Sequence, residues 1–225
     1  MKLKKLAQNT VFITSKNNKT ILIDPGKYNI GCGLFDISNF PTADILIITH
    51  KHADHYDLDI VKSIVSRSNP IILTNTEIKD FLLKENIESK ILNVGDTVNI
   101  LDYSITGIRT DHVVRDENII NFGVVVSSNG VSFYHTSDTR YIEPSLLPEI
   151  TRNKCVLVPI SNRGVVMGID DALVFCCELT PPIVIPMHYD SPKDLGRVNP
   201  EEFKMKGQSI GLEVMILKFG QEIEL

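Results

Sequence analysis

The chain carries the sequence ILIITHKHADHY at Ile45–Tyr56, and this stretch decides the fold. Its first five residues are apolar or β-branched and predict a strand over Ile45–Thr49. The next six contain three histidines and one aspartate, so four side chains able to bind a metal follow the strand directly. Successive side chains of an extended chain alternate in direction, so His50 and His52 point the same way. The stretch therefore predicts a buried strand that ends in a metal-binding cluster.

This cluster is too dense to be a chance feature of a polar surface loop. The chain has six histidines, and three of them fall within these six residues. Asp54 and His55 lie in the turn that enters a helix beginning near Asp57. The arrangement can offer two imidazoles to one ion, and a carboxylate with an imidazole to a second. Both ligand types suit Zn²⁺, so we expect a metal site.

The other three histidines also stand at or just past the ends of predicted strands. His112 follows the strand ending near Ile108, and His188 ends the apolar run PPIVIPM. His135 lies three residues before Asp138. A lone histidine is more often a hydrogen-bonded core or surface residue than a ligand. The shared position at strand ends favours a common site, because open α/β sheets bind ligands at that edge.

Short β-branched runs alternate with helical patterns along the whole chain. The predicted strands are Val11–Thr14, Thr20–Ile23, Ile45–Thr49, Ile71–Thr74, Ser104–Ile108, Phe122–Val126, Val131–Tyr134, Val156–Ile160, Ile183–Pro186 and about Glu213–Lys218. Asn129 and Gly130 predict a hairpin turn, because Asn-Gly tolerates positive φ. This interleaving predicts sheets covered on their outer faces by helices.

Three helices are predicted from caps and apolar periodicity. The predicted starts are Asp57, Thr76 and Asp170, and the third helix stops before Pro181. The side chains expected to face inward are Leu58, Val61, Ile64 and Val65 in the first helix, Ile78, Phe81 and Leu82 in the second, and Leu173, Cys176 and Cys177 in the third.

Composition excludes several classes of protein. The 225 residues carry a formal net charge of -5, which disfavours binding of a long nucleic acid, since that needs a basic face. No apolar run approaches the roughly 18 residues of a spanning helix, and the N-terminus does not read as a secretory signal. The four cysteines form no CxxC pair and are expected to be reduced thiols. We expect one domain over residues 1–225, located in the cytoplasm, with no membrane partner.

The ordered motifs resemble those of the metallo-β-lactamase superfamily. The resemblance spans Ile21–Pro25, the segment His50–His55, His112, Asp138 in HTSDT, and His188 in PMHY. The blocks YHTSDT, VPISNRGVVMGIDDA and IPMHY are most similar to the branch that contains ascorbate-6-phosphate lactonase. The resemblance implies an α/β fold, specifically a four-layer αβ/βα sandwich, with a two-metal site on one edge.

The resemblance also implies a role for each residue of the motifs. His50, His52 and His112 would hold the first metal ion, while Asp54, His55 and His188 would hold the second. Asp138 would bridge the two ions, and Asp24 would orient a ligand histidine. Zn is the expected metal, with Mn or Fe as alternatives. The chain departs from the family pattern at two places: Ala7-Gln8 replaces the usual Gly-His, and Ser137 replaces a glycine.

On this reading the protein is a hydrolase in which a hydroxide bridging two metals cleaves a small anionic ester or lactone. Asp54 or Asp138 would relay a proton to the leaving group, and the choice between them stays open. His135 is either a positioning residue beside Asp138, which we favour, or a catalytic acid/base. Four basic residues near the motifs either bind the anionic group or are solvated surface charges, and we favour the second for each: Lys51, Arg115, Arg140 and Arg163.

Two alternative functions stay open. A phosphodiesterase or nuclease could use the same site on small diesters. A non-catalytic metal-binding module would be expected to have a broken ligand set, whereas all seven positions are filled. Related proteins often associate, so a homo-oligomer stays open.

Overall fold

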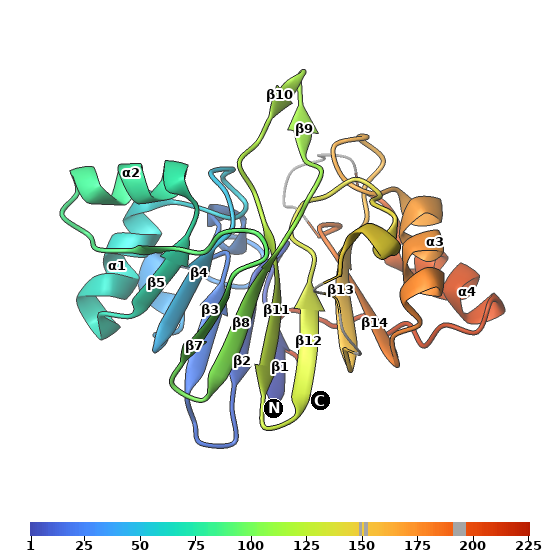
Figure 1. Ribbon diagram of the computed structural model, residues 1–225, viewed down its shortest axis with the longest axis horizontal. Helices are drawn as coiled ribbons and strands as arrows, with labels where there is room; N and C mark the ends of the chain where they lie inside the picture. Colours follow the sequence, from blue (N-terminus) through green and yellow to red (C-terminus); the bar gives the residue numbers. More distant parts are fainter. Residues whose placement is uncertain (149, 151–152, 191–196) are drawn as a thin grey trace.

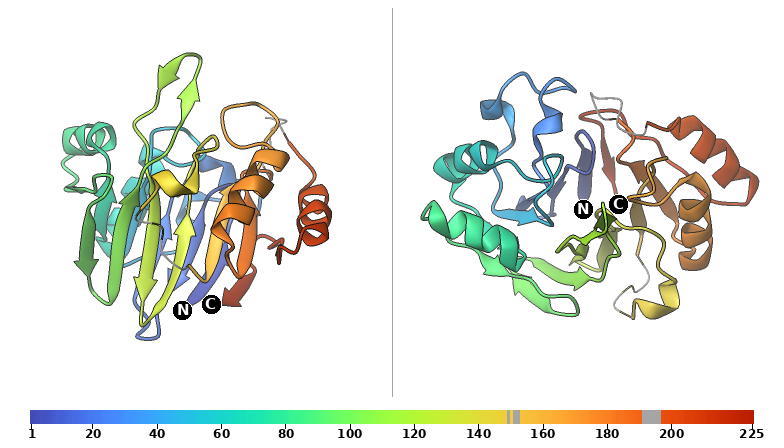
Figure 2. Two further views of the ribbon diagram at one scale, coloured as in Figure 1. Left: turned by 45° about the vertical axis from the view of Figure 1, so that its right-hand side comes forward. Right: turned by 90° about the horizontal axis from the view of Figure 1, so that it is seen from above.

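A computed structural model describes residues 1–148, 150, 153–190 and 197–225. Its strands form two large sheets that face each other, with helices on both outer sides (Figures 1 and 2). The first sheet has the order β15-β1-β2-β3-β4-β5-β6 and the second β14-β13-β12-β11-β8-β7. The arrangement confirms the predicted four-layer α/β sandwich.

The first sheet begins antiparallel and continues parallel. Strands β15, β1, β2 and β3 pair antiparallel, whereas β3 to β6 pair parallel. Its strands are β1 Lys2–Lys5, β2 Val11–Thr14, β3 Thr20–Ile23, β4 Ile45–Ile48, β5 Ile71–Thr74, β6 Lys90–Ile91 and β15 Glu222–Glu224.

The second sheet repeats this plan, with β7, β8, β11 and β12 antiparallel and β12 to β14 parallel. Its strands are β7 Thr97–Ile100, β8 Tyr103–Ile108, β11 Gly123–Ser128, β12 Val131–His135, β13 Cys155–Pro159 and β14 Ile183–Met187. A separate hairpin of β9 Val113–Val114 and β10 Glu117–Asn118 projects beyond the sheets (Figure 1). Asn129 and Gly130 have positive φ in the turn between β11 and β12, as predicted.

Helices cover the outer face of each sheet. The described helices are α1 Leu58–Ser68, α2 Thr76–Lys84, α3 Ile169–Leu179 and α4 Pro200–Ser209. Asp57 caps α1, since its side chain accepts from the N–H groups of Asp59 and Ile60. Helices α1 and α2 pack on the first sheet, and α3 and α4 pack on the second. None of the described helices is long and apolar enough to cross a bilayer.

A cluster of apolar side chains fills the space between the two sheets. It joins Leu3, Ile13 and Ile47 of the first sheet to Val124 and Phe133 of the second. All of these side chains are buried. The parallel strands of both sheets therefore present the loops after their carboxyl ends at one edge, where the candidate site lies.

Three predictions about elements are wrong. The segment Glu213–Lys218 is not a strand and makes only one bridge, between Val214 and Val184, because the chain then crosses to pair with β1 through Gly220 and Gln221. Phe81 is partly exposed on the flank of α2, where its ring stacks on Tyr56. Cys177 is exposed because it lies one residue around α3 from the buried Cys176.

Candidate metal centre

The loop after β4 carries most of the candidate ligands. It turns sharply, since the N–H groups of His55 and Tyr56 both donate to the carbonyl oxygen of His52. His50 and His55 are fully buried, and His52 and Asp54 are partly exposed. The turn therefore places four side chains of the predicted cluster on the edge between the two sheets.

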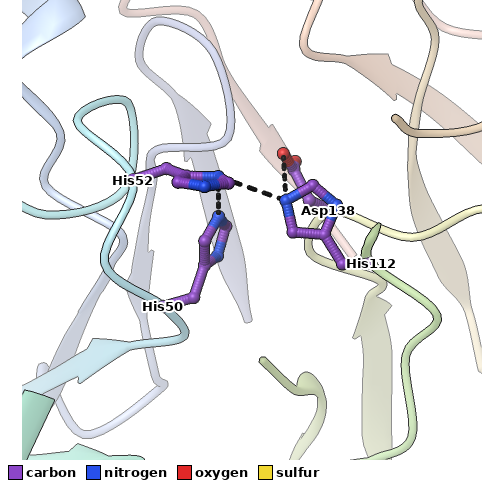
Figure 3. Close-up of side chains that lie close together, drawn as sticks. All are labelled: His50, His52, His112 and Asp138. Atoms are coloured by element: carbon purple, nitrogen blue, oxygen red, sulfur yellow. Dashed lines mark hydrogen bonds and ion pairs between the residues drawn. The ribbon is translucent and has the colours of Figure 1, made fainter. Parts of the chain in front are cut away.

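A first group of side chains converges there from both sheets. It contains His50, His52, His112 and Asp138, whose ligand atoms all lie within 4.8 Å of one another (Figure 3). Nδ1 of His52 lies 3.0 Å from Nε2 of His50 and 3.1 Å from Nε2 of His112. Nε2 of His112 lies 3.7 Å from Oδ2 of Asp138.

A second group lies beside the first and shares Asp138 with it. It contains Asp54, Asp138 and His188, again within 4.8 Å. Nε2 of His188 lies 3.3 Å from Oδ2 of Asp54 and 3.4 Å from Oδ2 of Asp138. Nε2 of His55 borders this group, at 3.7 Å from Asp54 and 3.2 Å from Asp138.

The hydrogen bonds around these rings fit a metal site. Nδ1 of His112 lies 3.0 Å from the carbonyl oxygen of Val165, an acceptor that requires a proton on Nδ1 and so leaves the lone pair on Nε2 facing the group. Nδ1 of His55 donates to Asp24 at 2.8 Å, which turns Nε2 toward Asp138. The ring nitrogens therefore present the donor set that Zn²⁺, Mn²⁺ or Fe²⁺ accepts.

Charge and burial act differently on the two groups. Burial lowers the pKa of His50 well below its usual value, so this ring stays neutral, as a ligand must be. Burial also opposes charge at His188, but Asp138 and Asp54 outweigh it and raise the pKa of His188 to about 10. Asp138 is likewise buried, yet His188 and His55 hold its pKa well below the usual range.

His135 lies behind the groups and not among them. Its Nε2 donates to the carbonyl oxygen of Asn9 at 2.7 Å, and its Nδ1 accepts from the N–H of Ser137 at 3.1 Å. Both ring nitrogens are thus occupied by backbone, and the side chain is fully buried. The structure thus places His135 outside both candidate metal groups, and its role as a positioning residue stays a prediction.

Asn9 is a site residue that the sequence did not single out. Its Nδ2 lies 2.8 Å from Oδ1 of Asp138 and 2.7 Å from Nε2 of His55. Nothing in the local pattern marks it, because it reaches the site from the turn between β1 and β2.

Ser137 adopts φ 57°, and its Oγ lies 2.8 Å from Oγ1 of Thr49.

A cavity of about 270 Å³ opens beside both groups. Its wall includes His52, Asp54, His112, Asp138 and His188, together with Gln8, Tyr28, Ala53, Val114, Arg163 and Val165. A larger cavity of about 830 Å³ lies near the chain ends and contains none of the candidate ligands. The smaller cavity is therefore the candidate substrate site, because the candidate metal ligands line it.

Of the four basic candidates, Arg163 borders this cavity. Lys51 instead pairs with Glu77 at 2.8 Å and with Glu117 at 3.3 Å. The other two are not part of the wall: Arg140 pairs with Asp111, and Arg115 stands in the turn between β9 and β10.

Comparison with known proteins identifies the family. The family model described as β-lactamase superfamily domain matches residues 2–188. The chain belongs to this superfamily. A UPF0173 metal-dependent hydrolase from Methanocaldococcus jannaschii is 32% identical over 91% of this chain and 94% of its own length. One from Nanoarchaeum equitans is 31% identical over the whole of both chains.

A solved structure of a metallo hydrolase is also similar to this chain. Igni18, described as a novel metallo hydrolase from Ignicoccus hospitalis, is 26% identical and superposes with a TM-score of 0.83. The match covers 100% of this chain and 98% of the other. The chain is accordingly a metal-dependent hydrolase, with a cluster of histidine and aspartate side chains that could bind metal ions.

Proposed function

We propose that this protein hydrolyses a small anionic ester or lactone with two divalent metal ions. The observation that carries the proposal is the 270 Å³ cavity, which borders both candidate metal groups and has Arg163 on its wall. A volume at the low end of ligand pockets suits a small metabolite. A guanidinium suits a carboxylate or phosphate on that metabolite.

The candidate ligands divide between two metal positions. His50, His52 and His112 would hold the first ion, and Asp54, His55 and His188 the second. Asp138 would serve both, because its carboxylate lies in both groups. Bound ions supply Lewis-acid chemistry, in which a water is activated as nucleophile and the bond to be cleaved is polarised. We expect Zn, with Mn or Fe as alternatives.

The remaining roles fall to the chain's own side chains. Arg163 would bind the anionic group of the substrate at the wall of the cavity. Asp54 and Asp138 both border the cavity, so either carboxylate could pass a proton to the leaving group. Asp24 would keep the ring of His55 in the orientation that a ligand requires.

The test is metal analysis followed by a substrate screen. We expect two divalent ions per chain, loss of activity with a chelator, and recovery with added Zn²⁺ or Mn²⁺. The metal-loaded protein is then assayed against lactones, phosphodiesters and thioesters. Turnover of lactones supports the proposal, whereas faster turnover of a chromogenic phosphodiester would instead assign a small-diester phosphodiesterase.

The substitution His52→Ala tests whether hydrolysis needs the first candidate metal group. It removes a side chain of the first group, so activity should fall at least about 100-fold while the fold is retained. Lys62→Ala is the control, since Lys62 of α1 pairs with Glu85 at the end of α2 and does not border the cavity. A folded His52→Ala protein with full activity in the same assay would revive the non-catalytic module.

A further inference from the structure

Gln8 stands at the edge of the site in a constrained conformation. It lies in the turn between β1 and β2 with φ 55°, in the left-handed region. Its backbone N–H donates to Oδ1 of Asp190 at 2.8 Å, and the other oxygen of Asp190 pairs with the buried Lys5 at 2.5 Å. Lys5 thus holds Asp190, and Asp190 in turn holds the backbone of Gln8.

The side-chain amide of Gln8 donates to no acceptor in the described part of the chain. The residue is 1% exposed, and Nε2 has no hydrogen-bond partner among the described residues. A buried polar group left unpaired is costly, and it is rare in native proteins outside functional sites. Gln8 also borders the 270 Å³ cavity, together with His188 and Arg163. The missing acceptor is therefore expected to arrive with a ligand.

We infer that the Gln8 amide donates a hydrogen bond to an oxygen of the bound substrate and so helps to set specificity. This inference rests on the proposed function, because it takes the cavity as the substrate site. The acceptor is an oxygen of the anionic group or of the bond that is cleaved, since both carry acceptors and Nε2 is donor only. Gln8 adds a neutral donor to the positive charge of Arg163.

The variant Gln8→Leu tests the inference because it has two effects of opposite direction. It keeps the approximate volume and removes the unpaired donor, so the melting temperature of the metal-loaded protein should stay equal or rise. The same change should weaken binding of inorganic phosphate, measured by calorimetry, about 10-fold or more. Gln8→His restores a ring N–H donor and should bind phosphate more tightly than Gln8→Leu does. Gln208→Leu, on the exposed face of α4, is the matched control for both measurements.

Several outcomes would overturn the inference. A melting temperature lowered by more than ~4 °C in Gln8→Leu would mean that the amide has a structural partner. Equal phosphate affinity in wild type and Gln8→Leu would mean that it contacts no ligand. Once a substrate is found, an unchanged KM in Gln8→Leu would refute its role in specificity while leaving the reaction intact. Weaker phosphate binding without turnover of any ester would leave Gln8 as a ligand donor and refute the proposed reaction.

Discussion

Asp24 shows how one buried side chain can orient a candidate metal ligand, the ring of His55. One oxygen accepts the backbone N–H of Thr49, and the other accepts Oγ1 of Thr49 and Nδ1 of His55, each at 2.8 Å. The three bonds join the loop after β3 to the loop after β4. The ring of His55 is therefore oriented by a residue 31 positions earlier in the chain.

The substitution Asp24→Asn tests this role. An amide cannot reproduce all three acceptor contacts, so the His55 ring loses its fixed orientation. We expect metal affinity at the second group to fall by about 10–100-fold. Titration with a competing chelator measures it. Asp44→Asn is the control, because Asp44 likewise accepts bonds from Thr20 but lies away from the site. Equal affinities in the two variants would contradict the role of Asp24.

At the scale of elements, the site depends on how tightly two loops pack. Gly26 follows β3, and a Cβ at this position would overlap the backbone carbonyl of Asp54. The N–H of Lys27 also donates to the carbonyl oxygen of Ala53 at 2.8 Å. The φ of Gly26 is -75°, which any residue can adopt, so backbone conformation does not require a glycine. The close approach of the two backbones does require one.

The variant Gly26→Ala should therefore displace the loop that carries Asp54. We expect a loss of about 2–3 kcal/mol of stability, typical of overpacking, together with weaker metal binding. Thermal unfolding and chelator titration measure the two effects. Gly168→Ala is the matched control, because its Cβ would meet nothing nearer than Ser161 at 3.7 Å. If both variants have wild-type stability and metal affinity, the loop that carries Asp54 can move to accept a Cβ at position 26.

Strands and helices with many apolar residues could be predicted from the sequence, whereas those with few could not. Val11–Thr14, Thr20–Ile23 and Ile71–Thr74 were predicted to the residue, because β-branched runs mark buried strands. Strand β1 was missed, since three of the four residues in its sequence KLKK are lysines and Lys5 is buried only through tertiary contacts. Helix α4 was also missed, because few of its residues are apolar and it contains Gly207.

The candidate site could be predicted because its histidines and aspartates stand at or near the ends of predicted strands. Histidines and aspartates at strand ends carry their chemistry in their identity, so His112 and His188 could be grouped with His50. Asn9 and Tyr28 reach the site only through the three-dimensional path of their loops, which no local pattern encodes. The roles of the seven candidate ligands stay predictions.

At the scale of the whole molecule, stability depends on the apolar layer between the two sheets. Phe133 of β12 is fully buried in that layer. Phe35, by contrast, is 95% exposed. The two phenylalanines therefore offer a matched pair for measuring how much the layer contributes.

The substitution Phe133→Ala should cost about 3–5 kcal/mol, because it removes a large apolar side chain and leaves a cavity. Phe35→Ala should change stability by less than about 0.5 kcal/mol. Denaturant unfolding of both variants measures the difference. A small effect at Phe133 would show that the sheets close over the space it leaves.

Both candidate metal groups draw side chains from the two sheets. His50 and His52 follow β4, whereas His112 follows β8 and His188 follows β14. All four cysteines are free, so no disulfide joins the halves. An ion held in either group would act as a cross-link between them, and it would stabilise the folded chain by mass action. The supply of metal ions would then govern how long the protein survives proteolysis, as well as whether it is active.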